Sequence, residues 1–472
     1  MKKILLTLAS AAMLFTSCDD KLDIKPYGSS TLSTVDELET LLNGLPYLWS
    51  GNDYFDLDVI CNNTYRPWNG VADYIGNDNS LRYAYFTYDE SIDRADLTDD
   101  DYRYNDLYQK INYMNTVISK VPGADGGTAQ KKDQIVAEAR VRRAWYHFLL
   151  VGMYARQYDE AEADVLGGIP YVDNTNSAEE KTKLSLKKTY ERILEDCADN
   201  VLENLVPTGV DNVCRCGLDF GYGVRARVLF QMKRYDEALR YADLALKING
   251  RLESRSAVKT TGNWILDYDC SSNYYLIYSD NSNLGDLYGY VISPEVAACI
   301  DPDDYVFKYY VAEPYMDPAW GTPYPTVPEG CLQSNIGDAR CNVWGLRSES
   351  MYYIKAECLI RSGQISEGLA QIDKVRASRI EDPEIYADKT GLTEAEAMKL
   401  LQDSKRFEFI KTFENFFDRK RWNSEEAYKA TIVRDLTSLG LGTYSLSPDS
   451  PIWVFPFPMN AVKHNKSLTQ NY

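Results

Sequence analysis

The chain has 472 residues, of which 44% are hydrophobic and 26% charged, so it is globular and large enough for several core layers. Acidic residues outnumber basic residues by 70 to 51, and the formal net charge of −19 repels a phosphate backbone, which argues against nucleic acid as a partner. The 37 Tyr and 8 Trp combine a flat apolar ring with a polar group. Such residues suit ligand platforms and interfaces, although most are expected to pack in the core.

The N-terminus has the pattern of a secretory leader. Lys2 and Lys3 precede an apolar run, 4–15, that is too short for a permanent membrane helix. Small residues then precede Cys18, in a pattern that resembles a bacterial lipobox, in which the cysteine is lipidated. We predict a signal peptide over 1–17 and acylation of Cys18, which would anchor the protein. An ordinary signal peptide followed by an incidental cysteine is the alternative.

The segment 61–79 is rich in turn-forming and aromatic residues. It contains Arg66, Trp68 and Asn69 among Asn, Asp and Gly residues. Because a loop cannot bury all of its aromatic rings, we expect some of these side chains to be exposed.

Helical periodicity becomes regular after residue 100. We expect helices over 101–120, 133–158 and 189–205. In the second of these, apolar residues form one stripe and the arginines form a solvated or paired face. His147 fits a packed helix residue better than a metal ligand.

No metal or cofactor site is predicted. Nine cysteines remain after Cys18, an odd number that does not support a disulfide framework. Cys214 and Cys216 are close enough for a metal clip, but no second Cys/His pair lies at ligand spacing. The Gly-Tyr-Gly-Val-Arg-Ala run at 221–226 matches a dinucleotide fingerprint, but it lacks the preceding strand and the βαβ unit that binding requires.

Two segments share one helix–turn–helix pattern. Small and apolar residues recur at helical spacing in 222–246, and every interval between them is reproduced in 347–379. The matched positions are Tyr222, Ala226, Leu229, Ala238, Ala242 and Ala245 in the first segment and Tyr352, Ala356, Leu359, Gly368, Ile372 and Val375 in the second. This pattern is typical of tetratricopeptide repeats, which bury their apolar faces by stacking. Two ordinary amphipathic hairpins are the alternative.

The longest irregular region, 249–328, lies between the two repeat segments. It contains many tyrosines together with Trp264 and Trp320. An insertion of this length is usually functional or disordered, and its aromatic content argues against disorder.

The C-terminal part begins with a predicted long helix over 393–422. The tail that follows is punctuated by prolines, and we expect it to wrap back over the domain. Trp453, Phe455 and Phe457 would otherwise be left exposed.

Over essentially its whole length the chain resembles the SusD/RagB family of surface nutrient-binding lipoproteins. The motifs that carry the resemblance are Cys18-Asp19-Asp20, Leu22-Asp23-Ile24-Lys25-Pro26, Arg143-Ala144-Trp145-Tyr146-His147-Phe148-Leu149, Gly167-Gly168-Ile169-Pro170, the repeat pair, Arg347 to Tyr352 with Ala356-Glu357, Lys405-Arg406-Phe407-Glu408-Phe409, Arg421-Trp422, and the run from Pro456 to Tyr472. No single motif is decisive, but their order and spacing together are specific. Phe413-Glu414-Asn415 departs from the Glu-Gly that the family usually has there, which leaves a local turn detail open.

The resemblance implies a mostly α-helical lipoprotein, with tetratricopeptide-like repeats in a curved scaffold and long aromatic-rich insertions. It implies a signal peptide over 1–17, a SusD-like region over 18–248, an insertion over 249–328 and a C-terminal region over 329–472. It also implies a place on the outer membrane at the cell surface and a SusC-like TonB-dependent transporter as partner. The ligand of such proteins is an oligosaccharide or, in some members, a peptide.

A binding protein without a cofactor fits the sequence better than an enzyme. The chain lacks H-E-x-x-H, G-x-S-x-G and Walker motifs and has two histidines, and acidic pairs are too common to be informative. We predict that Trp68 and one or more of four other aromatic residues stack on sugar rings, while Arg66 and Asn69 donate hydrogen bonds to hydroxyls. The four are Trp264, Tyr274, Tyr275 and Trp320. A peptide-binding member of the family and a repeat scaffold without a ligand are the alternatives.

Overall fold

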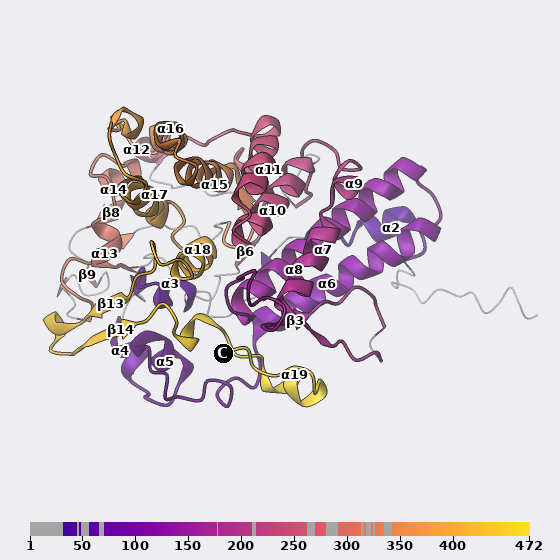
Figure 1. The fold of residues 1–472 in the computed structure, drawn as a ribbon, viewed down its shortest axis with the longest axis horizontal. Helices are drawn as coiled ribbons and strands as arrows, with labels where there is room; N and C mark the ends of the chain where they lie inside the picture. Colours follow the sequence, from indigo (N-terminus) through magenta and orange to yellow (C-terminus); the bar gives the residue numbers. More distant parts are fainter. Residues whose placement is uncertain are drawn as a thin grey trace, which may run out of the picture.

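The protein is mostly helical, which confirms the predicted fold class (Figure 1). The computed structural model describes residues 32–44, 47–48, 56–65, 70–176, 178–209, 214–261, 270–279, 291–312, 316–317, 322–323, 326–334 and 342–472. Within these residues no helix has both the length and the hydrophobicity needed to cross a membrane. The predicted leader and Cys18 lie outside the described residues.

The first hairpin consists of α6 (Tyr102–Lys120) and α7 (Ala129–Tyr154). From Ile135 onward nearly every side chain of α7 is buried. The Trp145 indole is fully buried, and its N–H donates to the Trp344 carbonyl at 2.8 Å. The helix α7 is therefore the central element of the helical layer.

The polar side chains of α7 are paired rather than solvated. Arg143 donates to both carboxylate oxygens of Asp196, at 2.6 and 2.8 Å. His147 Nδ1 bonds the Arg143 carbonyl at 2.9 Å, Nε2 accepts from Val172 N–H at 3.1 Å, and the ring stacks on Tyr171. Burial lowers the pKa of His147 to about 3, so the ring is neutral. His147 is a packed helix residue, as predicted.

The segment after α7 forms two helices instead of the single helix predicted over 189–205. These are α8 (Leu186–Asp196) and α9 (Asp199–Leu202), and the backbone of Ala198 between them is extended. Ala198 is the N-cap of α9, and a residue in that position starts a new helix rather than continuing the old one.

The two repeat segments fold as matched hairpins. The first is α10 (Leu218–Gln231) with α11 (Tyr235–Ile248), and the second is α15 (Ser348–Arg361) with α16 (Ile365–Ala377). Their turns use the same backbone. Lys233 and Gly363, which are equivalent, both have positive φ, and the next N–H in each turn donates to the carbonyl of the matched leucine. The repeat prediction is therefore confirmed at the level of single hydrogen bonds.

The hairpins stack on one another although 249–347 separates them in sequence. The helix α11 packs against α15, and Lys355 Nζ bonds Asp243 at 2.6 Å across the contact. In Figure 1 the helices α6, α7, α8, α10, α11, α15 and α16 follow one another across the molecule as one curved layer.

The predicted long helix over 393–422 is also broken in two. It forms α17 (Glu394–Glu408) and α18 (Glu414–Asn423), with Lys411 at φ 62° between them. The Lys411 N–H donates to the Asp58 carboxylate at 2.6 Å instead of to a helix carbonyl. This bond ties the turn to a distant loop, which periodicity alone could not indicate.

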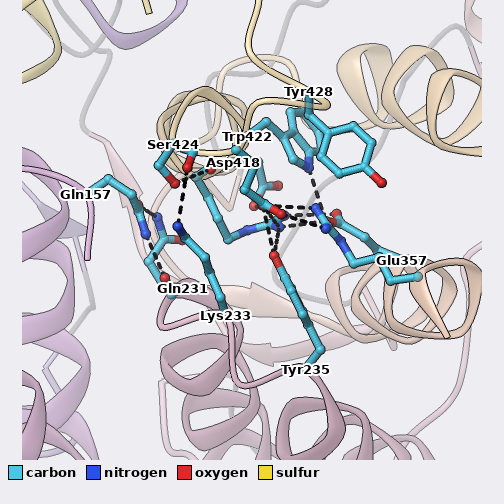
Figure 2. A network of polar contacts seen from close by, with 12 residues as sticks. Gln157, Gln231, Lys233, Tyr235, Glu357, Asp418, Trp422, Ser424 and Tyr428 are labelled. Atoms are coloured by element: carbon cyan, nitrogen blue, oxygen red, sulfur yellow. Dashed lines mark hydrogen bonds and ion pairs between the residues drawn. The ribbon is translucent and has the colours of Figure 1, made fainter. Parts of the chain in front are cut away.

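A buried ion network joins α18 to the two repeats (Figure 2). The Arg421 guanidinium donates to both oxygens of Glu357 at 2.6 and 2.9 Å, and Trp422 Nε1 donates to the same carboxylate at 3.1 Å. Burial opposes the ionisation of Glu357, but Arg421 and Arg361 outweigh burial and hold its pKa below the ordinary value. The network fixes α18 against α15 of the second repeat and, through the Arg421 bond to the Tyr235 hydroxyl at 3.2 Å, against the start of α11 in the first repeat.

The tail folds back over the domain, as predicted. After the hairpin of β13 (Ile432–Asp435) and β14 (Thr443–Leu446), the chain runs to α19 (Met459–His464). Trp453, Phe455 and Phe457 are buried.

Short elements complete the fold. The helices are α2 (Val35–Glu39), α3 (Asp56–Ile60), α4 (Ala72–Ile75), α5 (Leu81–Thr87), α12 (Val258–Thr261), α13 (Pro294–Ala297) and α14 (Tyr305–Tyr310). The paired strands are β1 (Tyr47–Leu48) with β6 (Tyr278–Ser279), β3 (Gly167–Pro170) with β4 (Lys183–Ser185), β5 (Asn273–Tyr275) with β12 (Leu346–Arg347), and β9 (Met316–Asp317) with β10 (Thr322–Pro323).

Candidate ligand-binding face

A four-stranded sheet joins the two aromatic-rich segments. Its order is β2 (Thr64–Tyr65), β7 (Val291–Ile292), β11 (Leu332–Ser334) and β8 (Val311–Ala312), with antiparallel neighbours. In this sheet Thr64 pairs with Ile292 and Tyr65 with Val291. The strand that leads into 66–69 is therefore hydrogen-bonded to the insertion 249–328.

The other end of 66–69 is tied to the same insertion. Val71 N–H donates to the Thr326 carbonyl at 2.7 Å. Gly70 has φ +51°, and a Cβ at this position would lie 2.4 Å from the Thr326 oxygen. Glycine is required here, both for the positive φ and for the close backbone approach. The residues on both sides of 66–69 are thus hydrogen-bonded to the insertion.

A polar cluster, which we call the loop base, supports the start of this loop. It consists of Asp58, Asn62 and Asn63, all buried. Asn62 has φ 53°, and its carbonyl accepts from Ser293 Oγ at 2.8 Å and from Arg406 Nη2 at 3.1 Å. Asparagine tolerates this left-handed conformation better than most residues.

Two arginines from the C-terminal part hold the loop base. Arg406 Nε donates to Asn63 Oδ1 at 2.9 Å. Arg434 is fully buried, donates to Asn62 Oδ1 at 3.1 Å and to the carbonyls of Val59 and Phe86, and lies over the Phe86 ring. These contacts link α17 and β13 to the loop.

Asp58 completes the loop base. Its carboxylate accepts from Asn63 Nδ2 at 2.9 Å and from Lys411 N–H at 2.6 Å. Burial raises the pKa of Asp58 to about 6, although these hydrogen bonds and the charges of Lys411 and Arg406 act in the opposite direction. The loop base is thus a buried, hydrogen-bonded cluster directly before β2.

Tyr274 and Tyr275 are not part of an exposed platform, which corrects the prediction for these two residues. Their exposed fractions are 2% and 1%. Tyr274 OH donates to the Asn249 carbonyl at 2.6 Å, and Tyr275 OH bonds Tyr146 OH at 3.0 Å. The strand β5 lies beneath α10 beside β12, so neither ring has a face open to a ligand.

The other predicted ligand contacts lie outside the described residues. These are Arg66, Trp68, Asn69, Trp264 and Trp320. The structure places the residues that flank 66–69 beside the described strands of the insertion.

The cysteines of the described residues form no disulfide bonds. Cys214 and Cys216 are buried, and Arg215 between them donates to Glu138 at 2.6 Å and to Glu39 at 2.7 Å. Within the described ranges no group of three or more His, Cys, Asp or Glu side chains is arranged to hold a metal ion.

The structure also contains a cavity that none of the loop-base residues lines. It is a cavity of about 400 Å³ between the loop after α7, the end of α18 and the segment 448–454. None of the predicted ligand-contacting residues lines it. Sequence reasoning missed both this cavity and the loop base, because both combine side chains from segments far apart in the chain.

Comparison with known proteins gives one consistent family. A family model described as "Starch-binding associating with outer membrane" matches residues 22–216, and the model of the SusD family matches residues 332–472. A SusD-like protein of Bacteroides ovatus is 26% identical over 166 residues, which are 33% of this chain and 28% of that relative. The match therefore spans much less than two thirds of the relative's length.

Solved structures share the fold over almost the whole chain. A SusD superfamily protein of Bacteroides thetaiotaomicron superposes with a TM-score of 0.72 at 17% identity, covering 93% of this chain and 100% of that one. A SusD-like carbohydrate binding protein of Bacteroides vulgatus gives 0.67 at 15% identity, covering 92% and 97%. Surface glycan-binding protein A of Bacteroides fluxus gives 0.64 at 15% identity, covering 93% and 98%.

Proposed function

This chain belongs to the SusD/RagB family, and from that premise we propose that it captures oligosaccharides at the cell surface and passes them to a SusC-like TonB-dependent transporter. The observation that carries the proposal is the pairing of β2 with β7, together with the bond from Val71 to Thr326. These contacts support a single site formed by 66–69 and the insertion.

The chemistry of the proposed site follows from its residue types. Trp68 and one or both of Trp264 and Trp320 stack on the apolar C–H faces of sugar rings, while Arg66 and Asn69 donate hydrogen bonds to hydroxyls. By analogy with base stacking, each stacked ring contributes about 1–3 kcal/mol. Two rings with solvent-exposed hydrogen bonds give a Kd of roughly micromolar to millimolar, which suits a protein that must release its ligand to a transporter.

Other proteins named for carbohydrate binding support a glycan over the alternatives. The solved structures from Bacteroides vulgatus and Bacteroides fluxus are described as carbohydrate-binding and glycan-binding proteins. A peptide ligand, or a repeat scaffold without a ligand, is the competing function. Because this is a family of binding proteins, ligand binding is a better proposal for this chain than catalysis.

Calorimetry with an oligosaccharide panel tests the site. We expect Trp68→Ala and Trp320→Ala each to weaken binding of the recognised glycan by roughly 5- to 150-fold, the equivalent of one lost stacking contact. Tyr102→Ala is the control, because it removes an exposed ring on α6, outside 61–79 and 249–328. Unchanged affinity in both tryptophan variants would contradict the site, and a response to peptides alone would favour the peptide alternative.

We further propose that residues 1–17 are removed and that Cys18 carries the lipid that anchors the protein to the outer membrane. Two or more acyl chains on one residue suffice for stable anchoring. Cys18→Ala should therefore release the protein from the membrane fraction, and an unchanged membrane-bound fraction would contradict the lipidation.

A further inference from the structure

The cavity of about 400 Å³ has a buried floor and an exposed rim. Lys420, Asn423, Trp453 and Val454 are each at most 5% exposed and form the floor. The rim consists of exposed residues that include Arg156, Glu162 and Asp449. The volume is within the range of natural small-molecule sites. No residue of 61–79 or 249–328 lines it, so it is independent of the proposed glycan site.

Lys420 supplies a hydrogen-bond donor at the floor. Its ammonium donates to the carbonyls of Gly152 and Ala155, both at 2.7 Å, at the end of α7. An ammonium has three N–H groups, so one remains after these two bonds, and the Nζ also lies 5.5 Å from the centre of the Phe416 ring. Among the described residues no carboxylate lies within ion-pair distance of Lys420, although the chain has many acidic side chains.

Asn423 supplies a second donor one helical turn away on α18. Its Nδ2 is buried and has no hydrogen-bond partner in the described part of the chain, while its Oδ1 accepts a long bond from Ala430 N–H at 3.5 Å. A buried amide N–H without a partner destabilises the folded state. Residues three apart on a helix lie on the same face, and both Lys420 and Asn423 line the cavity.

We propose that this cavity binds a small organic monocarboxylate, whose oxygens accept hydrogen bonds from Lys420 Nζ and Asn423 Nδ2. The Trp453 indole and Val454 form an apolar wall for the rest of the ligand. The acidic rim residues Glu162 and Asp449 repel a dianion more strongly than a monoanion, which favours a ligand with a single negative charge.

Protonation of Lys420 is coupled to this binding. Burial lowers the pKa of Lys420 to about 7. A carboxylate beside the amine favours the charged form, so binding takes up a proton and strengthens as the pH falls from 8 toward 7. The other charged groups that face the cavity are Arg156, Asp159, Glu162 and Asp449, and Asp159 is bonded to Lys233.

Calorimetry on the full mature chain tests the proposal with lactate, benzoate and glucuronate, each paired with a neutral partner: lactamide, benzamide and glucose. We expect at least one carboxylate to bind with a Kd below about 1 mM and its neutral partner to bind at least about tenfold more weakly. Titrations in two buffers of different ionisation enthalpy should show proton uptake at pH 8. A panel without a binder, or equal binding of a neutral partner, would overturn the proposal.

Variants separate binding from structure. Asn423→Leu removes the unpartnered donor, so we expect an unchanged or higher Tm together with at least about tenfold weaker carboxylate binding. Asn415→Leu is the control on the same helix, outside the cavity, and should leave binding unchanged. Lys420→Met should abolish both binding and proton uptake. It also removes two hydrogen bonds to the end of α7, so the Lys420→Met protein can fail to fold. In that case Asn423→Leu decides the question. Unchanged binding in Asn423→Leu would refute the site.

Discussion

The repeat layer and the loop base are stabilised in different ways. In the two repeat hairpins, helices approach closely through small residues at fixed spacing, and both turns use the same backbone bonds. At the loop base, the Asn62 carbonyl accepts a hydrogen bond from Ser293 and the Asn62 side-chain oxygen accepts one from Arg434, and these partners lie 231 and 372 positions away. The first kind of contact can be predicted from the local periodicity of the sequence. The second depends on which distant side chains the finished fold brings together.

The largest expected effect comes from breaking the ion network that joins the repeats to α18. Arg421→Ala leaves the Glu357 carboxylate buried without its bidentate partner, and we expect the free energy of unfolding to fall by about 3–5 kcal/mol. Arg234→Ala is the control, because its pair with Glu237 is exposed and should contribute less than about 1 kcal/mol. Urea unfolding measures both. Similar losses in the two variants would mean that the buried network contributes no more than a surface pair.

A second test uses pH, because burial shifts the pKa values of two groups in opposite directions: His147 in α7 of the helical layer and Asp58 in the loop base. The pKa of His147 is lowered to about 3, so the folded state resists its protonation and stability falls below pH 6.5, by about 2 kcal/mol at pH 5. The pKa of Asp58 is raised to about 6, so the folded state holds this proton more tightly and stability rises by about 1 kcal/mol between pH 7 and 5.

Substitutions separate the two pH effects. His147→Gln should lose less stability than the parent protein between pH 7 and 5, whereas Asp58→Asn should lose more. Urea unfolding at the two pH values gives both slopes. Identical slopes in all three proteins would show that neither group titrates differently on folding.

A third test compares equivalent positions of the two repeats. A Cβ at Gly368 would lie 2.7 Å from the Ala356 carbonyl oxygen and 2.7 Å from Ile360 Cγ1. Gly368→Ala should therefore lower stability by about 1–3 kcal/mol despite the better helix propensity of alanine. Ala238→Gly, at the matched position, should lower it by about 1–2 kcal/mol, through the poorer helix propensity of glycine and the loss of a buried methyl group. Thermal unfolding measures both, and a stabilised Gly368→Ala would show that propensity outweighs close packing.

The smallest expected effect concerns the repeat turns. Lys233 has φ 62°, where a side chain is unfavourable, and Gly363 has φ 83° at the matched position with no atom near its missing Cβ. Gly363→Ala should lower the free energy of unfolding by about 1 kcal/mol, and Lys233→Gly should raise it by up to about 1 kcal/mol. The same sign in both variants would contradict the equivalence of the turns.

Prediction from sequence succeeded where a pattern was local. The intervals from Tyr222 to Ala245 recur from Tyr352, and the two hairpins were predicted from that repetition. The buried tail aromatics, such as Trp453, followed from composition alone.

The predictions were wrong where contacts with distant parts of the chain determine the backbone conformation or the burial of a side chain. The break between α17 and α18 depends on Asp58, which accepts the Lys411 N–H. Tyr274 and Tyr275 lie in a segment with the composition of an exposed loop. However, β5 pairs with β12 and contacts α10, and this places both rings in the core. The proposed stacking by Trp68 and Trp320 stays a prediction.

The end of α7 has a consequence for the order in which the chain can fold during synthesis. Its last carbonyls are bonded by Lys420, 268 positions later, and by Asn471 Nδ2, 317 positions later. Because synthesis starts at the N-terminus, the central helix is complete long before these donors exist. Until then, the end of that helix must be hydrated or held by a chaperone, because unpaired carbonyls cannot be buried without loss of stability. We therefore expect the native layer to close only after residue 471 has been synthesised, which makes its folding post-translational.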